Sequence, residues 1–229
     1  MRIDVITIFP DMFREVFDFG IARRAREAGL VSLQVHDLRS WTNDRHRTTD
    51  DAPYGGGPGM VMKVQPLVEA SEAIAAMGHG GAPRLVLLSP RGLPLDQPKV
   101  QELSEEDHLV LVAGRYEGVD ERFVEITGAE EFSIGDYVLS GGEIPAMVVI
   151  DAVVRLLPGA ISDPQSAEED SFSRGVLDFP HYTRPAEFRG SRVPEVLLSG
   201  DHAAVREWRE SRALSDTRSR RPELLRERR

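Results

Sequence analysis

The chain of 229 residues is 41% hydrophobic, so it can bury a core, which argues against disorder over its whole length. It contains no cysteine, which excludes disulfides and thiolate zinc sites. Its formal net charge is −10, but residues 189–229 carry +4 and residues 1–188 carry −14, so a basic tail could still hold a nucleic acid.

The N-terminal sequence, MRIDVITIFP, lacks the basic region, long apolar run and small-residue cleavage site of a signal peptide. No window in the chain approaches the roughly 20 apolar residues that a membrane span needs. We therefore expect a cytoplasmic protein with no membrane partner.

Four segments in the first half of the chain are predicted as strands. Three are almost continuously apolar, as expected for strands covered on both faces in a parallel sheet: residues 3–9, 84–89 and 108–114. Residues 31–38 alternate between apolar and polar, which predicts a strand nearer an edge. Helical patterns separate these strands, at residues 11–28, 64–77 and about 96–105. This alternation predicts an α/β fold, with a parallel sheet and helices on both faces.

The second half begins with the strongest predicted helix, residues 143–157, in which Pro145 suits the first turn. Residues 160–185 are polar, irregular and too long for an ordinary connection, which indicates a functional segment or a linker. Periodic runs at 194–198, 201–214 and 222–228 predict a small helical domain. The expected parts are an α/β domain over 1–160, a linker over 161–185 and a helical domain over 186–229.

Three predicted strands end in unusual turns, LLSPRG at 87–92, VAGRYEGVDER at 112–122 and SIGDYVLSGGEIPAM at 133–147. The last begins as a buried strand over 134–139 and then turns at Gly141 and Gly142. Since carboxyl ends of parallel strands share one edge of a sheet, these loops are expected to cluster there and bind a ligand. Glycines let a ligand approach the backbone, which suits a neutral heterocycle read by main-chain hydrogen bonds.

The alternative is that the glycines of these loops only make turns. For any one glycine that is the better interpretation, but five around two strand ends favour a site: Gly114, Gly118, Gly135, Gly141 and Gly142. Neither these loops nor APYGGGPGM at 52–60 matches a phosphate-binding motif, because GxxxxGK[ST] and GxGxxG are both absent. An NTPase or a dinucleotide enzyme is therefore disfavoured.

Six segments occur in one order over nearly the whole chain: DAPYGGGPGMVMK, LLSPRG, GRYEGVDER, SIGDYVLSGGE, EEDSF and DFPHYTRP. Together they resemble the bacterial tRNA (guanine-N1)-methyltransferases, SPOUT-class enzymes that methylate the guanine immediately 3′ of the anticodon. The resemblance implies a C-terminal trefoil knot in the α/β domain, with S-adenosylmethionine bound in the knot. The cofactor-binding residues that it implies are Leu88, Pro90, Gly114, Tyr116, Glu117, Ile134, Gly135, Tyr137, Leu139, Gly141 and Gly142.

Methyl transfer to guanine N1 needs a general base, because N1 carries a proton. The resemblance gives this role to Asp170, and it places Arg155 beside guanine O6, where negative charge develops as the proton leaves. Both residues also have simpler interpretations. Asp170 lies in an acidic run that could be solvated, and Asp151 with Arg155 has the spacing of a helix ion pair.

Glu117 is the acid of the second loop, and the resemblance implies that it could place a magnesium ion near the cofactor. A single glutamate in a turn is more often merely exposed, and magnesium draws much of its coordination from water and substrate.

The C-terminal domain carries arginines suited to RNA phosphates, with Trp208 as a core residue or a platform for a base. These arginines are Arg206, Arg209, Arg212, Arg218, Arg220 and Arg221. Because Glu207 and Glu210 lie among them, ordinary helix charge pairs are the alternative. The resemblance implies a homodimer in which this domain grips the anticodon stem-loop of a tRNA bound mainly by the other subunit.

Each active site would then be built from both chains, with the linker carrying Asp170 to the partner's cofactor. The motif residues Asp178, His181, Tyr182 and Arg184 could bind RNA, brace the dimer or anchor the linker. Two alternatives to the main prediction stay open. They are a knotted methyltransferase of another RNA nucleotide, and a non-catalytic RNA-binding module, against which the intact EEDSF and GRYEG segments count.

Overall fold

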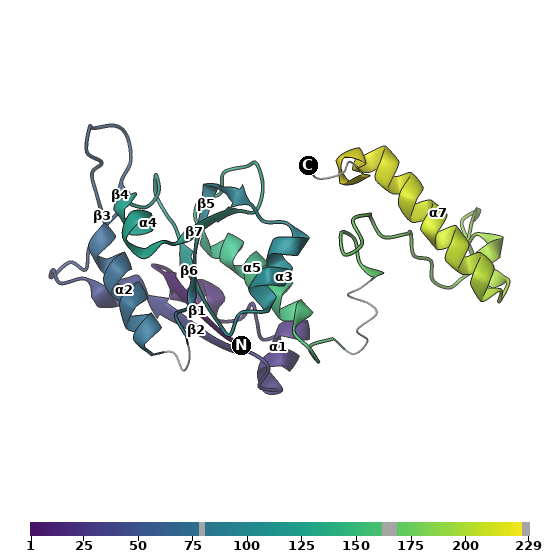
Figure 1. Cartoon of the computed structure of the whole chain (residues 1–229), viewed down its shortest axis with the longest axis horizontal. Coiled ribbons are helices and arrows are strands. Elements are labelled where there is room, and N and C mark those ends of the chain that lie inside the picture. The colour runs from purple at the N-terminus through teal and green to yellow at the C-terminus, as the bar shows by residue number, and fades with distance from the viewer. Residues whose placement is uncertain (78–80, 162–168, 226–229) are drawn as a thin grey trace. The chain divides into compact units, whose positions relative to one another are not determined.

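A computed structural model describes residues 1–77, 81–161 and 169–225. It divides the chain into two compact units, Met1–Ser162 and Asp163–Arg229 (Figure 1). No helix in the described parts of the chain is both long and apolar enough to cross a bilayer.

The first unit is built on a five-stranded sheet in which every pair of neighbours is parallel. Its order is β2-β1-β6-β5-β7, and its strands are β1 (Arg2–Thr7), β2 (Ser32–Asp37), β5 (Arg84–Pro94), β6 (His108–Ala113) and β7 (Glu130–Ser133). The three continuously apolar segments are the three inner strands, and the alternating segment is the edge strand β2. The predicted parallel α/β sheet is confirmed.

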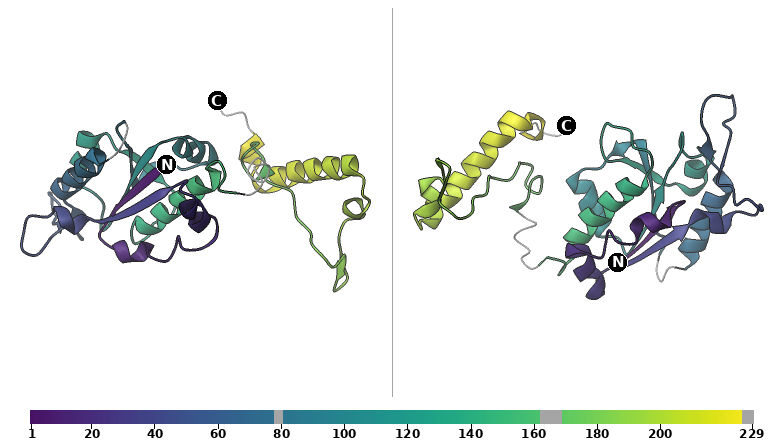
Figure 2. Two further views of the ribbon diagram at one scale, coloured as in Figure 1. Left: turned by 90° about the horizontal axis from the view of Figure 1, so that it is seen from below. Right: turned by 180° about the vertical axis from the view of Figure 1, so that it is seen from behind.

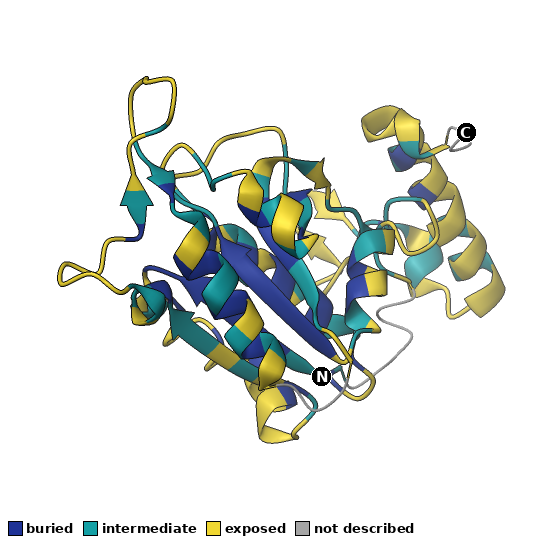
Figure 3. Ribbon diagram, turned by 60° about the vertical axis from the view of Figure 1, so that its left-hand side comes forward, coloured by how far each residue is buried: buried dark blue, intermediate teal, exposed yellow. Residues whose placement is uncertain are grey.

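Helices cover both faces of this sheet (Figure 1). One face carries α1 (Gly20–Glu27), α3 (Gln97–Ser104) and α5 (Glu143–Leu156), and the other carries α2 (Val64–Ala76), α4 (Arg122–Thr127) and η2 (Leu38–Trp41). Because side chains alternate along a strand, each inner strand feeds both cores. Leu109 and Leu111 of β6 pack on the α5 side, whereas Val110 and Val112 pack on the α2 side. Figure 3 shows the inner strands of the sheet mostly in the dark blue of buried residues.

The prediction of one helix over residues 11–28 is wrong. The chain instead forms η1 (Pro10–Phe13) and, after a break, the short helix α1. Phe19 is extended and Gly20 has φ +62°, a left-handed conformation that interrupts a right-handed helix. Phe13 and Phe17 are buried in the core, so tertiary packing of these rings replaces helical hydrogen bonding between the two pieces.

The prediction of a buried strand over residues 134–139 is also wrong. Strand β7 ends at Ser133, whose hydroxyl donates to the Gly135 carbonyl at 3.0 Å, and Gly135 has φ +152°. This turn carries the sheet-forming residues that follow away from the ladder, and Tyr137 and Val138 are exposed. Helix α4 and the small hairpin of β3 (Asp50–Asp51) and β4 (Val61–Met62) were not predicted.

The second unit is organised around the long helix α7 (His202–Arg220), with η3 (Glu195–Leu198), η4 (Pro222–Leu225) and a hairpin of β8 (Glu187–Phe188) and β9 (Ser191–Arg192). Asp201 caps α7 by accepting from the amides of Ala203 and Ala204. The segment before α7 starts beside the last turns of that helix, where the Leu177 amide donates to the buried Thr217 hydroxyl at 2.9 Å. From there it returns to the N-terminus of α7 (Figure 2).

The predicted helices of this unit are only partly correct. Helix α7 continues past residue 214 to Arg220, and of the run 222–228 only η4 lies in the described residues, which end at 225. Residues 162–168 of the expected linker also lie outside the described residues.

A buried carboxylate ties β1 to its two neighbours in the sheet, β2 and β6. Asp4 of β1 is fully buried, and its oxygens lie 2.6 Å from His36 Nε2 and 2.8 Å from His108 Nε2, while Arg2 Nε donates to it at 2.6 Å. Burial alone would raise the pKa of Asp4, but the hydrogen bonds from His36, Arg2 and His108 outweigh it and hold the pKa well below its ordinary range.

We predict that Asp4→Asn lowers the free energy of unfolding by about 3 kcal/mol at pH 7, because it breaks a buried charged network. Since the folded state holds the pKa of Asp4 down, this stabilisation is complete above the ordinary carboxyl pKa and declines as the pH falls below about 4. Urea unfolding at pH 7 and pH 3 measures it, with the exposed Asp107→Asn as control. Equal stability of Asp4→Asn and the unmodified chain at pH 7 would contradict the prediction.

Candidate active site

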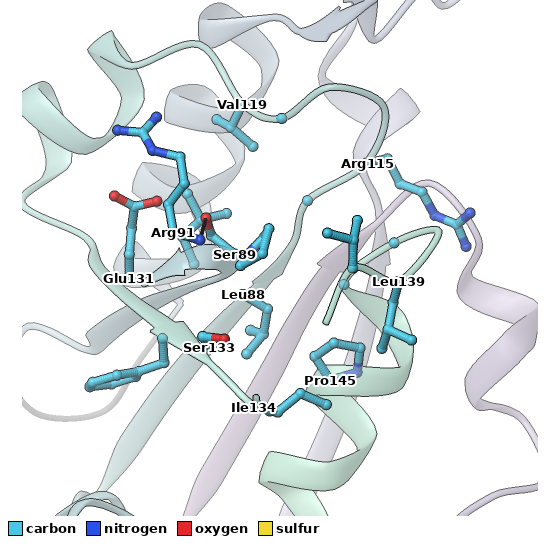
Figure 4. Close-up of a pocket in the computed structure, with 18 of the residues that line it drawn as sticks. Leu88, Ser89, Arg91, Arg115, Val119, Glu131, Ser133, Ile134, Leu139 and Pro145 are labelled. Atoms are coloured by element: carbon cyan, nitrogen blue, oxygen red, sulfur yellow. Dashed lines mark hydrogen bonds between the residues drawn. The ribbon is translucent and has the colours of Figure 1, made fainter. Parts of the chain in front are cut away.

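Three loops at the carboxyl ends of β5, β6 and β7 enclose a cavity of about 270 Å³ in the first unit (Figure 4). The loops are residues 89–92, 114–119 and 134–142. Leu88, Ile134 and Leu139 point into the space between them, and Pro145, at the start of α5, closes one side. The predicted clustering of these loops at one sheet edge is therefore present in the structure.

The first loop is an excursion within strand β5. Leu88 and Leu93 both pair with Phe132 of β7, so residues 89–92 leave the ladder and return to the same partner. A Cβ on Gly92 would lie 2.5 Å from the Glu131 carbonyl carbon and the Phe132 nitrogen. Only glycine fits where the chain re-enters the sheet this closely.

The second and third loops touch through their backbones. The Gly142 amide donates to the Gly114 carbonyl at 2.7 Å, and Arg115 bridges to Gly141 in an antiparallel pairing. A Cβ on Gly142 would lie 2.7 Å from the Gly114 nitrogen and 2.8 Å from the Ala113 Cα. Gly142 is thus required by the close approach of two backbones that form the cavity wall.

A buried charge lies directly behind this contact. Glu143, the first residue of α5, is fully buried and accepts from Thr7 Oγ1 and from Arg115 Nε, both at 2.8 Å. Arg115 also donates to the Ser140 carbonyl at 3.1 Å, and its guanidinium lies 4.6 Å from the centre of the Phe9 ring. The end of β1, the second loop, the third loop and the start of α5 are therefore joined by one polar network.

Little in the sequence predicts this network. The sequence pattern predicts Glu143 only as part of a helix and Thr7 only as part of an apolar strand. The available signal was an acid followed by an apolar helix and preceded by two glycines, since a charge in such surroundings must be paired. Its partner, Arg115, is distant in sequence and could not be identified from spacing.

The wall of the cavity is largely neutral, with charged groups at its edge. Arg91 donates to Glu121 at 2.9 Å, which pairs two of the charged lining residues. Tyr116 has φ +62°, and its partial burial, together with the carboxylate of Asp50, raises the pKa of its phenol. Tyr116 is therefore neutral at pH 7 and can donate a hydrogen bond.

All eleven residues that the sequence assigned to the cofactor line this one cavity: Leu88, Pro90, Gly114, Tyr116, Glu117, Ile134, Gly135, Tyr137, Leu139, Gly141 and Gly142. Apolar walls beside exposed main-chain groups fit a ligand with a flat, neutral heterocycle such as the adenine of S-adenosylmethionine. Lining residues that the sequence analysis did not single out include Ser89, Arg91, Val119 and Glu131.

Glu117 lies at the mouth of the second loop, where its amide donates to the Met60 carbonyl at 3.0 Å. Its side chain occupies the space that a Cβ on Gly59 would need. Within the described ranges, no three His, Asp or Glu side chains are grouped so that they could hold a metal ion. Glu117 fits a magnesium ion only as one protein ligand among water and substrate oxygens.

The two predicted catalytic residues lie in different units. Arg155 is half-buried in the last turn of α5, in the first unit. Asp170 is half-buried in the second unit, where its main-chain carbonyl accepts from the Ser173 amide at 3.3 Å. Asp178 pairs with His181 at 2.8 Å, and the Tyr182 and Trp208 rings lie 6.2 Å apart, so these residues of the DFPHYTRP motif support the local fold of that unit.

A glycine-rich cavity at the carboxyl ends of parallel strands defines a ligand-binding α/β protein. The family model described as tRNA (Guanine-1)-methyltransferase TrmD matches residues 1–227. A tRNA (guanine-N(1)-)-methyltransferase of Stutzerimonas stutzeri (strain A1501) is 56% identical, with 98% of this chain and 90% of the relative covered. Another protein of that name, from Methylococcus capsulatus (strain ATCC 33009 / NCIMB 11132 / Bath), is 57% identical over 98% and 89%. The chain belongs to the tRNA (guanine-1)-methyltransferase family, which confirms the resemblance.

We predict that Gly142→Ala lowers the free energy of unfolding by about 1–3 kcal/mol, because the new methyl group overlaps the backbone of the second loop. It should also weaken binding of S-adenosylmethionine, since separating these backbones opens the cavity wall. Thermal unfolding and calorimetric titration measure the two effects. The control is Gly81→Ala, whose Cβ would meet nothing within 4 Å. Unchanged behaviour of Gly142→Ala in both experiments would contradict the proposed role of the backbone contact.

Proposed function

We propose that the chain transfers a methyl group from S-adenosylmethionine to N1 of the guanine immediately 3′ of the anticodon in tRNA. The observation that carries the proposal is the convergence of eleven residues, all assigned from sequence, on one cavity in a member of this family. The relatives are named tRNA (guanine-N(1)-)-methyltransferases, which supports guanine N1 of tRNA as the methylated atom.

The cofactor is proposed to bind in the cavity, with its heterocycle against Leu88, Ile134 and Leu139 and within reach of the loop main chain. When bound, it supplies a methyl group on a sulfonium whose departure leaves a neutral thioether. We further propose that the chain is threaded here as a trefoil knot. The close backbone contact between Gly114 and Gly142 supports this, because it holds two of the loops together.

Asp170 is proposed to remove the proton from guanine N1, and Arg155 to stabilise the charge that then develops on O6. Guanine N1 is a poor nucleophile until it is deprotonated, so a positioned carboxylate is the group the reaction needs most. A guanidinium is always charged near neutral pH and donates from a fixed planar fork, which suits a developing oxyanion.

We propose that the enzyme is a homodimer whose active sites each combine two chains. Support comes from exposed apolar side chains in the segment 9–19, which contains η1 and ends before α1, and in the first half of α5, which a partner could cover: Phe9, Met12, Val16, Phe19, Ile144 and Val148. Phe9 and Met12 both contact Arg115, which pairs with Glu143 beside Ile144, so part of this set is contiguous. The linker 161–185 would then carry Asp170 of one chain to the cavity of the other.

The second unit is proposed to bind the anticodon stem-loop, with residues 186–229 as the tRNA-binding domain. Most side chains of α7 are exposed, and the arginines among them suit phosphate contacts. Across the dimer we expect a basic channel despite the net charge of −10. A magnesium ion at Glu117 would help place the cofactor carboxylate, and a cytoplasmic location follows from the tRNA substrate.

The decisive experiment measures transfer of labelled methyl groups from S-adenosylmethionine to a tRNA transcript with guanine next to the anticodon. We predict label in this transcript, none in one with adenine at that position, and a loss of about 100-fold or more with Asp170→Asn. Glu169→Gln is the matched control, because this neighbouring acid is exposed.

Cofactor binding by Asp170→Asn should persist, which separates a lost base from a lost cavity. Label at another nucleotide would indicate a different RNA target. Bound cofactor without any transfer to RNA would indicate a non-catalytic binding module, and either result would overturn the proposal.

A further inference from the structure

A second cavity, of about 380 Å³, is lined by residues of the second unit alone. It is formed by the segment 179–186, the end of the β8–β9 hairpin, η3 and one face of α7. Val205, Trp208 and Arg209 project into it from α7 at the i, i+3 and i+4 spacing of a single helix face. The Val193 amide donates to the Ala186 carbonyl at 2.9 Å and closes the hairpin beside it.

The walls of this cavity are aromatic. Phe179 is buried, with the His181 ring 4.8 Å from its own and the Arg209 guanidinium 4.6 Å from its centre, so the face of this ring is already used. The Tyr182 and Trp208 rings, 6.2 Å apart and tilted, are more accessible, and Tyr182 is 49% exposed. An accessible aromatic pair can stack on a flat heterocycle of any base.

The charge of the cavity is positive. Among the described residues that line it are Arg184, Arg209 and one histidine, and no carboxylate. His181 is held by Asp178 at 2.8 Å, which leaves the two guanidinium groups as the charged donors at the edge. Aromatic faces beside two guanidinium groups complement a base and its phosphate, whereas a protein segment would bring fewer negative charges to them.

We propose that this cavity holds an unstacked nucleobase from a single-stranded part of the tRNA substrate. The base stacks on Tyr182 and Trp208, and Arg184 and Arg209 contact the adjoining phosphates. This inference rests on the proposed function, because it takes tRNA as the substrate. It gives Tyr182 and Arg184 of the DFPHYTRP motif a recognition role in addition to their contacts within the unit.

The test uses the fluorescence of Trp208, which lines the cavity, as its probe. The chain has two tryptophans, and Trp41 lies in the first unit, so Trp41→Phe leaves Trp208 as the only one. In the full-length Trp41→Phe protein, we expect an anticodon stem-loop RNA to quench the Trp208 fluorescence, and a loop-free duplex of the same stem to quench it far less. Quenching by both RNAs to the same extent, or by neither, would overturn the inference.

A second variant makes the test independent of fluorescence. Tyr182→Ala should raise the KM for tRNA by about tenfold, as expected for one lost stack on a base, with kcat and S-adenosylmethionine affinity unchanged. The control is Phe188→Ala, which removes another exposed aromatic of the same unit outside the cavity. An equal effect of both variants, or none from Tyr182→Ala, would contradict the inference.

The outcomes separate the two proposals. Methyl transfer with an unchanged KM in Tyr182→Ala and no quenching would refute the base-binding cavity and leave the proposed function intact. Quenching by the stem-loop without methyl transfer would support the base-binding cavity and refute the proposed function. A Trp208 signal that changes on dilution of the protein alone, with no further change on adding RNA, would show that a second copy of the chain fills the cavity, and would refute the inference.

Discussion

The cavity depends on a buried carboxylate, Glu143, whose charge can be kept only while its partners stay in place. Thr7 reaches it from the end of β1 and Arg115 from the second loop, each at 2.8 Å. Loss of Arg115 would leave an uncompensated charge in the core, and loss of Thr7 would leave the other carboxylate oxygen without its hydrogen bond. The second loop therefore cannot separate from α5 without a large loss of stability. With the contact between Gly114 and Gly142, this network holds the cavity ready for a ligand.

The residues that line the cavity also explain why the general base is expected to come from outside it. Its walls are mainly apolar or main-chain, and the carboxylates that line it in the described structure are Glu117, Glu121 and Glu131, of which Glu121 is bound to Arg91. Such a site can hold a cofactor, but it offers few groups that could take a proton from guanine. On our account the base comes from the second unit, as Asp170, and a partner chain brings it to the site.

The elements of the fold that could be predicted from the sequence are those determined by neighbouring residues. Continuous apolar runs identified the inner strands, and Pro145 with the following apolar run identified α5, because these signals act over neighbouring residues. The break before α1 depends on the left-handed Gly20 and on the burial of Phe13 and Phe17 in the core, and the end of β7 depends on the turn at Gly135; periodicity reports neither. Pairings such as Glu143 with Arg115, or Asp4 with His108, join residues far apart in sequence.

The claim that each active site uses two chains is tested most directly by mixing two inactive variants, Asp170→Asn and Arg155→Gln, under conditions that allow subunit exchange. If Asp170 acts on the partner's cavity, a mixed dimer has one intact site, and the mixture should recover about a quarter of the original activity per chain. Each variant alone should stay inactive. If the mixture also stays inactive although mixed dimers have formed, both residues must act within one chain, and the account of a shared site is wrong.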